Sequence, residues 1–213
     1  QNGGMRLSFF DFIKLVNNPF QDEGMREVGA LLGPRTLVLS IAAGIPLQRL
    51  AADLAPGQPV IRAMPNTPAL IGAGMTVLCP ATGVDPDQVE IATQLMRTAG
   101  AVAIIDDEKL MDAVTALSGS GPAYLYLVAE ALSDGGVACG LPRDLADRLA
   151  QQTLFGSSRL LLESGEHPAR LKSQVTSPGG TTIAALRCLE AKGTRSAFIE
   201  AVIAAWQRSR ELN

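Results

Sequence analysis

The stretch of this sequence best equipped for chemistry is a short turn, residues 176–182, that is rich in hydroxyl groups and glycine. It contains the consecutive glycines Gly179 and Gly180 and four hydroxyl side chains, on Thr176, Ser177, Thr181 and Thr182. A helix is predicted to begin within it and to run to Lys192. Glycines can turn successive N–H groups toward one point, where the helix dipole favours negative charge. A simple helix cap is the alternative, but four hydroxyls exceed what a cap requires, which favours a carboxylate site.

Two loops that follow apolar, strand-like segments are candidates for holding a cofactor. They read Ser-Ile-Ala-Ala-Gly at 40–44 and Met-Pro-Asn-Thr-Pro at 64–68. In doubly wound sheets, ligands lie beyond the carboxyl ends of the strands. Small residues let the backbone approach a ligand, and Asn66 offers both donor and acceptor atoms. The alternative, that these residues only permit tight turns, stays open on these grounds.

Three further features carry weaker signals. The string Gly119-Ser120-Gly121-Pro122 begins a predicted helix and can hold an anion, but the apolar helix behind it favours a packing role. Asp106, Asp107 and Glu108 precede another helix, where acids usually complement the dipole. His167 stands at a helix start as a surface or capping residue.

The elements that must position these segments fall into two halves. The first half alternates predicted strands, at 36–41, 59–64, 75–79 and 101–105, with helices at 46–54 and 85–98. After Asp106 only helices are predicted, over 108–117, 122–139, 143–164, 167–174, 181–192 and 196–212. This order indicates an α/β fold with a doubly wound sheet in residues 1–105, followed by an all-helical domain in 106–213.

The first 27 residues follow neither a helical nor an extended period, although a helix is expected over 25–32. They read like short pieces placed end to end, and we hypothesise that residues are missing between them. The complete sequence of the natural protein would settle this point.

Composition excludes several classes of function. The chain is 47% hydrophobic and 18% charged with a net charge of −3, and it contains no basic run, which argues against a nucleic-acid partner. No apolar stretch reaches the length of a membrane span. Cys79, Cys139 and Cys188 are far apart and form no CxxC pattern, so we expect reduced thiols, no metal site and a cytoplasmic protein.

Five strings of the sequence, in order, resemble pyrroline-5-carboxylate reductase. They span residues 40–45, 62–68, 112–124, 134–137 and 175–182. Their order and spacing hold from about residue 36 to the end of the chain. One such string would be a weak signal, whereas five in sequence are highly specific.

The resemblance implies a Rossmann-type domain followed by a helical dimerisation domain. Members of the family reduce L-1-pyrroline-5-carboxylate to L-proline with NADPH or NADH, the last step of proline synthesis. The resemblance further implies a homodimer, possibly assembled into a decamer, with each substrate site at the dimer interface.

Roles for individual residues also follow from the resemblance. The substrate-binding set comprises Gln174, Val175, Thr176, Ser177, Gly179, Gly180, Thr181 and Thr182. The expected catalytic residues are Thr182, whose hydroxyl would hold the ring nitrogen and help a proton arrive, and Glu108, which would contact the substrate. The loops expected to face the dinucleotide contribute Ile41, Ala42, Ala43, Met64, Pro65 and Asn66.

The sequence departs from the family upstream, because no clear GxGxxG phosphate loop precedes Val28. A helical dimerisation or regulatory module without a working cofactor domain is therefore an alternative. A relative of the β-hydroxyacid dehydrogenases is a weaker one, since those enzymes use a lysine of the helical domain. Here Lys109, Lys172 and Lys192 lie in no comparable motif. The choice between NADH and NADPH is open at this stage.

Overall fold

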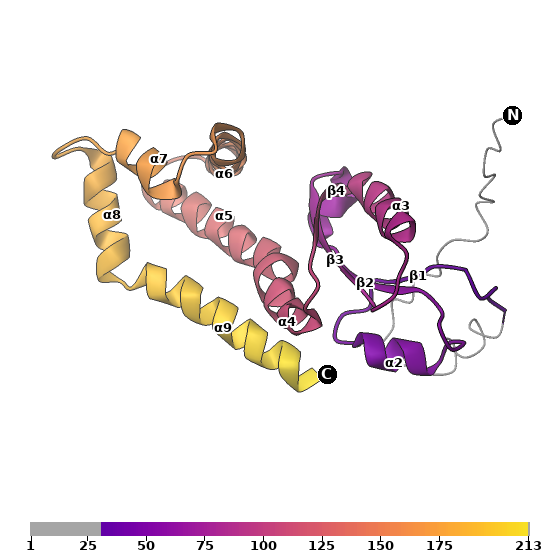
Figure 1. Ribbon diagram of the computed structural model, residues 1–213. Helices are drawn as coiled ribbons and strands as arrows, with labels where there is room; N and C mark the ends of the chain where they lie inside the picture. The colour runs from indigo at the N-terminus through magenta and orange to yellow at the C-terminus, as the bar shows by residue number, and fades with distance from the viewer. Residues whose placement is uncertain (1–30, 213) are drawn as a thin grey trace, which may run out of the picture. The chain divides into compact units, whose positions relative to one another are not determined.

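The computed structural model describes residues 31–212 of the chain (Figure 1). These residues form two compact units. The first comprises 31–122 together with 202–212, and the second comprises 123–201. The expectations for residues 1–27, and for most of the helix predicted over 25–32, lie outside the described residues. A domain boundary near residue 105 stays a prediction.

The described part of the first unit is built on a four-stranded sheet with the order β1-β2-β3-β4. The strands are β1 (Val38–Ser40), β2 (Val60–Met64), β3 (Gly74–Pro80) and β4 (Gly100–Ile104). The helix α2 (Leu47–Ala52) joins the parallel pair β1 and β2, and α3 (Pro86–Arg97) joins the parallel pair β3 and β4. The predicted alternation of strand and helix is confirmed.

The central pair of strands, β2 and β3, is antiparallel, which the sequence did not indicate. Residues 65–73 connect them and contain only the short 3-10 helix Thr67–Ile71. A parallel connection needs a crossover of about a dozen residues or more, so the chain folds back directly beside β2, with Met64 opposite Val77. The α/β class is confirmed, with a mixed sheet.

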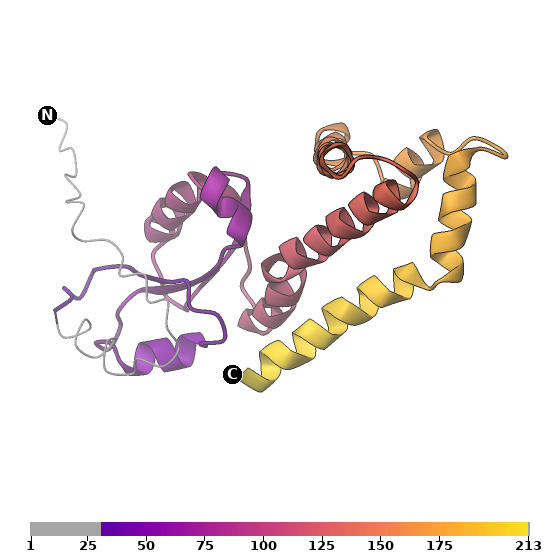
Figure 2. The same cartoon turned by 180° about the vertical axis from the view of Figure 1, so that it is seen from behind.

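Helices cover both faces of this sheet, and Figures 1 and 2 show α2 and α3 on opposite sides of the strands. On one face Leu39, Ile61 and Leu78 are at most 1% exposed and pack with Ala92 of α3. The other face packs against Leu50 of α2 and Met111 of α4 (Met111–Val114) through the alternate strand residues Val38, Val60, Val77 and Cys79. Side chains of a strand point alternately to the two faces, so one apolar run supplies both core layers.

The segment after β4 changes its helical form twice. A 3-10 helix spans Glu108–Leu110, α4 follows, and a π-helical turn covers Thr115–Gly119. The backbone N–H of Ser120 closes this turn on the carbonyl of Thr115, at 2.8 Å. The hydroxyls of Thr115 and Ser118 bond carbonyls four residues back, which tends to bend helices. The prediction of one regular helix over 108–117 is therefore wrong, although every residue of the segment is helical.

The remaining helices agree with the predicted ones to within two residues. They are α5 (Gly121–Ala138), α6 (Arg143–Ser164), α7 (Pro168–Gln174), α8 (Thr181–Ala191) and α9 (Thr194–Leu212). Gly165, with a φ of 63°, ends α6 in the left-handed conformation that glycine adopts without strain. The last residues of α9 belong to the first unit, where the Ser209 hydroxyl donates to Asp112 Oδ1 at 2.7 Å.

Candidate active site

The first predicted cofactor loop leaves β1 at a buried serine. Ser40 is 2% exposed, and its hydroxyl oxygen accepts a hydrogen bond from the N–H of Ala42 at 3.4 Å. Ala42 is itself buried, whereas Ala43 is exposed and Gly44 has a φ of 77°. The loop thus presents backbone and the small side chain of Ala43, while Ala42 belongs to the core.

The second predicted cofactor loop is held by the side chain of Asn66. Its amide nitrogen donates to the carbonyl of Ser118 at 3.1 Å, and its amide oxygen accepts from the N–H of Met75 at 2.9 Å. These bonds tie the loop after β2 both to the start of β3 and to the π-helical turn. In this arrangement Asn66 shapes the loop, and the donor and acceptor atoms noted in the sequence serve the fold itself.

The two loops leave the same edge of the sheet. β1 and β2 are parallel, with Ser40 paired to Arg62, so their carboxyl ends lie together. This is the edge at which doubly wound sheets bind ligands. The structure therefore brings together the predicted cofactor segments 41–43 and 64–66.

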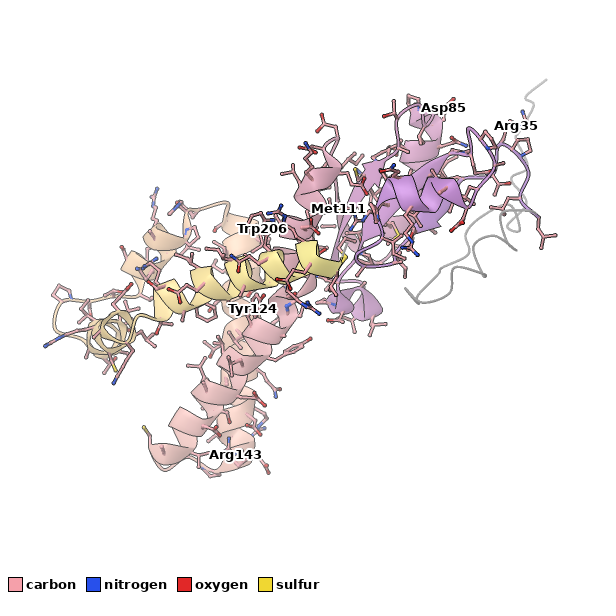
Figure 3. All side chains as sticks on the ribbon, turned by 90° about the horizontal axis from the view of Figure 1, so that it is seen from below. Arg35, Asp85, Met111, Tyr124, Arg143 and Trp206 are labelled. Atoms are coloured by element: carbon pink, nitrogen blue, oxygen red, sulfur yellow. The ribbon has the colours of Figure 1, made fainter. Side chains whose placement is uncertain are left out.

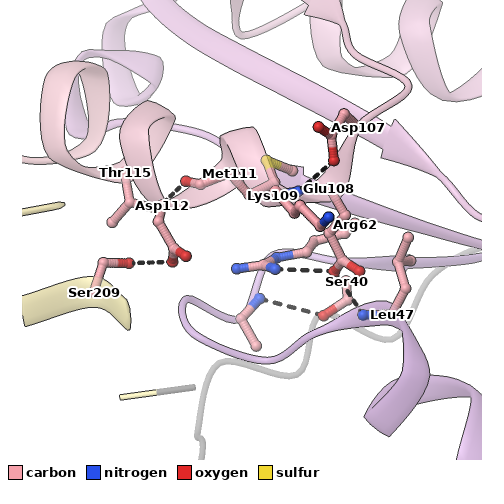
Figure 4. Close-up of polar contacts among 11 residues, drawn as sticks. Ser40, Leu47, Arg62, Asp107, Glu108, Lys109, Met111, Asp112, Thr115 and Ser209 are labelled. Atoms are coloured by element: carbon pink, nitrogen blue, oxygen red, sulfur yellow. Dashed lines mark hydrogen bonds and ion pairs between the residues drawn. The ribbon is translucent and has the colours of Figure 1, made fainter. Parts of the chain in front are cut away.

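Glu108 lies within the first unit and contacts two other elements (Figure 4). Its Oε1 atom accepts from the N–H of Leu47 at 2.7 Å and from Nη1 of Arg62 at 3.0 Å. The Arg62 side chain is only 5% exposed and that of Glu108 is 29% exposed. The sequence signals Arg62 only as a charged residue within the apolar run of β2, and no role was predicted for it.

The glycine-rich string at 119–121 packs closely on the second loop. A Cβ at Gly119 would lie 2.6 Å from Cε of Met64. A larger residue there would displace Met64. The contact with Met64 therefore supports the packing role that the sequence favoured for this string.

The predicted substrate turn lies in the second unit, between α7 and α8. Gly179 has a φ of 69°, and the N–H of Gly180 bonds the carbonyl of Ser177 at 3.2 Å, which closes a tight turn. Any side chain at Gly180 would overlap the Ser177 hydroxyl. The left-handed backbone thus requires glycine at 179, whereas the Ser177 hydroxyl is the rotatable end of a side chain and can move away from a Cβ at 180.

The start of α8 carries no side-chain cap. Gly180 occupies the N-cap position, and the first turn contains no acidic residue. The Thr176 hydroxyl bonds the carbonyl of Lys172 at 2.6 Å, whereas no hydrogen bond of the Thr181 or Thr182 hydroxyl to another described residue is found. The helix thus begins at a glycine N-cap after a glycine turn, which agrees with the helix-cap alternative, and an anion bound at its first N–H groups stays a prediction.

The chemistry available elsewhere in the described part of the chain is limited. There, no group of three histidine, cysteine or acidic residues is placed to bind a metal ion. None of the helices in residues 31–212 is at once long and apolar enough to cross a membrane.

Burial raises the pKa of the Cys79 thiol, and the nearby Glu108 carboxylate adds to the rise.

Comparison with known proteins places this arrangement in one family. Residues 108–212 match the family model described as pyrroline-5-carboxylate reductase dimerisation. The pyrroline-5-carboxylate reductase of Synechocystis sp. is 54% identical over 84% of this chain and 66% of its own length. That of Escherichia coli K12 is 43% identical over 89% of this chain and 70% of its own length.

Solved structures agree with the sequence comparison. The pyrroline carboxylate reductase of Plasmodium falciparum, solved with NADP bound, superposes with a TM-score of 0.82 at 33% identity. The match covers 89% of this chain and 72% of that one. The chain spans about two thirds of the length of the curated relatives that it matches.

Proposed function

Because the chain belongs to the pyrroline-5-carboxylate reductase family, we propose that it reduces L-1-pyrroline-5-carboxylate to L-proline with NADPH or NADH. This reaction is the last step of proline biosynthesis. The observation that carries the proposal is sequence identity that extends through both units, including the edge of the sheet and the turn before α8.

The turn 174–182 is proposed to bind the substrate carboxylate. The N–H groups around Ser177–Thr181 and the positive end of the α8 dipole complement a negative charge. Gln174, Val175 and Thr176 lead into the turn from α7 and complete the binding set. The Thr182 hydroxyl is proposed to hold the ring nitrogen and to help a proton reach it.

The edge of the sheet is proposed to hold the dinucleotide. Ile41, Ala42 and Ala43 follow β1, and Met64, Pro65 and Asn66 lie at the end of β2 and just beyond it. The exposed, small side chain of Ala43 beside Gly44 leaves room for a ligand to approach the backbone. When bound, the dihydronicotinamide supplies a hydride to the C=N carbon. The protein contributes orientation and proximity, because a protonated imine is already a good electrophile.

The partner is proposed to be a second copy of the chain. Large apolar side chains of α5 and α6 are exposed, among them Leu127 at 63%, Phe155 at 60% and Leu162 at 83%. A surface of this kind favours an interface, and residues 108–212 match a dimerisation model. Assembly of dimers into decamers, and a cytoplasmic location, are the finer parts of the proposal.

The test is the oxidation of NADPH by the purified full-length chain in the presence of pyrroline-5-carboxylate, with proline identified by mass spectrometry. The same assay with NADH decides the cofactor preference. A chain that binds NADPH and forms no proline would overturn the proposal in favour of a dimerisation or regulatory module.

Thr182→Ala tests the proposed role of the hydroxyl. We expect kcat/KM to fall at least about tenfold, equivalent to about 1.4 kcal/mol of transition-state binding. Thr182→Ser should retain most of the activity, and Thr98→Ala, at the exposed end of α3, serves as the matched control. Unchanged kinetics in a correctly folded Thr182→Ala protein would remove the residue from the mechanism.

A further inference from the structure

We infer that Arg62 and Glu108 position the dinucleotide-binding loop, so that Glu108 acts on the reaction through this loop rather than by touching the imine. The contacts of Glu108 Oε1 with the Leu47 N–H and with Arg62 Nη1 are called the Glu108 bridge below. The inference rests on the proposed function, because the loop at 41–46 is part of the proposed cofactor site.

Burial makes the ion pair within the bridge necessary. The Arg62 side chain lies within the sheet face that packs on α2, at 5% exposure. A buried guanidinium is costly unless an acceptor compensates its charge. Glu108 reaches it at 3.0 Å from a position 46 residues later in the chain. The pair therefore connects β2 to the short helix Glu108–Leu110.

Local structure places Glu108 for this contact. Asp107 precedes the 3-10 helix, and its Oδ1 atom accepts from the N–H of Lys109 at 3.0 Å. This cap fixes where the helix begins. On the far side of Glu108, Met111 is fully buried under β3. The carboxylate is thus held between a capped helix start and an anchored core residue.

The start of α2 depends on the same carboxylate. The helix is six residues long, its N-cap residue is Pro46 without a side-chain cap, and its first turn contains no acid. So short a helix is marginal by itself, and its first N–H groups have no partner within the helix. The Leu47 N–H finds Glu108 Oε1 at 2.7 Å, which supplies both a hydrogen bond and a favourable charge at the N-terminus.

These contacts bracket the proposed cofactor loop. Its first end is held at Ser40, whose hydroxyl accepts from the Ala42 N–H. Its second end, Leu47, is held by Glu108. The loop between them contains the exposed Ala43 and the left-handed Gly44. Removing the carboxylate would release one end of the loop and leave the buried Arg62 without the acceptor at its Nη1 atom.

If the Glu108 bridge positions this loop, its loss should weaken NADPH binding and leave the reaction of the bound substrate largely unchanged. Glu108→Gln and Arg62→Met should each raise the KM, and the dissociation constant, for NADPH by about tenfold. The KM for pyrroline-5-carboxylate and the kcat at saturating NADPH should change less than about threefold. Arg62→Lys keeps the positive charge and should restore much of the NADPH affinity.

Hydrogen exchange measured on the full-length protein supplies a readout that is independent of activity. In Glu108→Gln and Arg62→Met, the amides of residues 41–52 should exchange faster, while those of α3 keep their wild-type rates. The matched controls are Glu90→Gln and Arg97→Met, which break an exposed ion pair of 4.0 Å on α3. Both controls should leave NADPH binding unchanged.

Each contrary outcome has a distinct meaning. A rise in the KM for pyrroline-5-carboxylate with unchanged NADPH binding would place Glu108 at the substrate and overturn the inference. Unchanged exchange at 41–52, faster exchange throughout the protein, or a wild-type chain that binds neither NADPH nor NADH would overturn it as well. Failure of the proposed function is distinguishable, because it appears as NADPH binding without proline formation in the wild-type chain.

Discussion

The first unit buries leucine, isoleucine, valine and methionine side chains on both faces of its sheet, whereas Ala146 and Ala150 are the buried apolar residues in the described second unit. The second unit instead exposes large apolar side chains, such as Tyr126 at 61% and Leu162 at 83%. Burial of apolar surface is the main favourable contribution to folding. The first unit therefore contains its own core, and the second needs a further surface to complete one.

Polar contacts account for part of the cohesion within the second unit. Ser133 on α5 is 3% exposed and donates to Asp147 of α6, while Arg143 Nη1 donates to the Ser133 hydroxyl at 2.9 Å. Arg143, labelled in Figure 3 at the start of α6, also pairs with Asp134 of α5 at 2.8 Å. Small residues and one polar cluster thus join these helices, where the first unit uses apolar layers.

The largest effect is expected from truncating the core of the first unit. Leu78→Ala removes a fully buried side chain from the face that packs on α3. We expect the free energy of unfolding, measured by urea denaturation, to fall by about 2–5 kcal/mol. Leu70→Ala is the control, since that side chain is 90% exposed, and it should change stability by less than about 0.5 kcal/mol. Equal effects of the two substitutions would contradict a core confined to the sheet faces.

A smaller loss is expected from the polar cluster of the second unit. Ser133→Ala leaves the acceptor on Asp147 and the donor on Arg143 without their shared partner. The cost should be about 1–3 kcal/mol, measured as the loss of hydrogen-exchange protection in α5 and α6. Ser173→Ala, which removes an exposed hydroxyl bonded to its own helix, is the control. No change in either helix would show that the cluster contributes nothing to their stability.

The smallest effect is expected from dilution of the protein, which should destabilise the second unit and leave the first unit unchanged. If a second chain completes the second unit, tenfold dilution should lower its stability by about 1.4 kcal/mol per dimer. Hydrogen exchange of α5 and α6 should then quicken below the dissociation constant, while β2 and β3 keep their rates. Concentration-independent exchange in both units would argue that the second unit folds without a partner.

Local signals in the sequence predicted most of the elements. The helix over 143–164 was predicted with the bounds that the structure has, because Pro142 and Gly165 mark its two ends. Asp85 and Pro86 marked the start of α3, where the Asp85 carboxylate accepts from the N–H of Asp87 at 2.8 Å. These signals act within one turn of helix and need no distant contact.

Contacts between distant residues lay beyond such signals. The antiparallel pairing of β2 with β3, which sets Met64 opposite Val77, follows from a connection too short for a crossover. The amide of Asn66 was expected at the cofactor, and it joins Ser118 to Met75. Its contact with a dinucleotide stays a prediction.

The sequence by itself determined the α/β order of the first unit, the helices of the second and the family, because each rests on local pattern or on strings read in order. Tertiary structure decided what the charged residues do. Glu108 read as one of three acids before a helix, and its partners Leu47 and Arg62 precede it by 61 and 46 residues. A buried charge is compensated by whatever the fold brings within hydrogen-bond distance, and no local pattern encodes that distance.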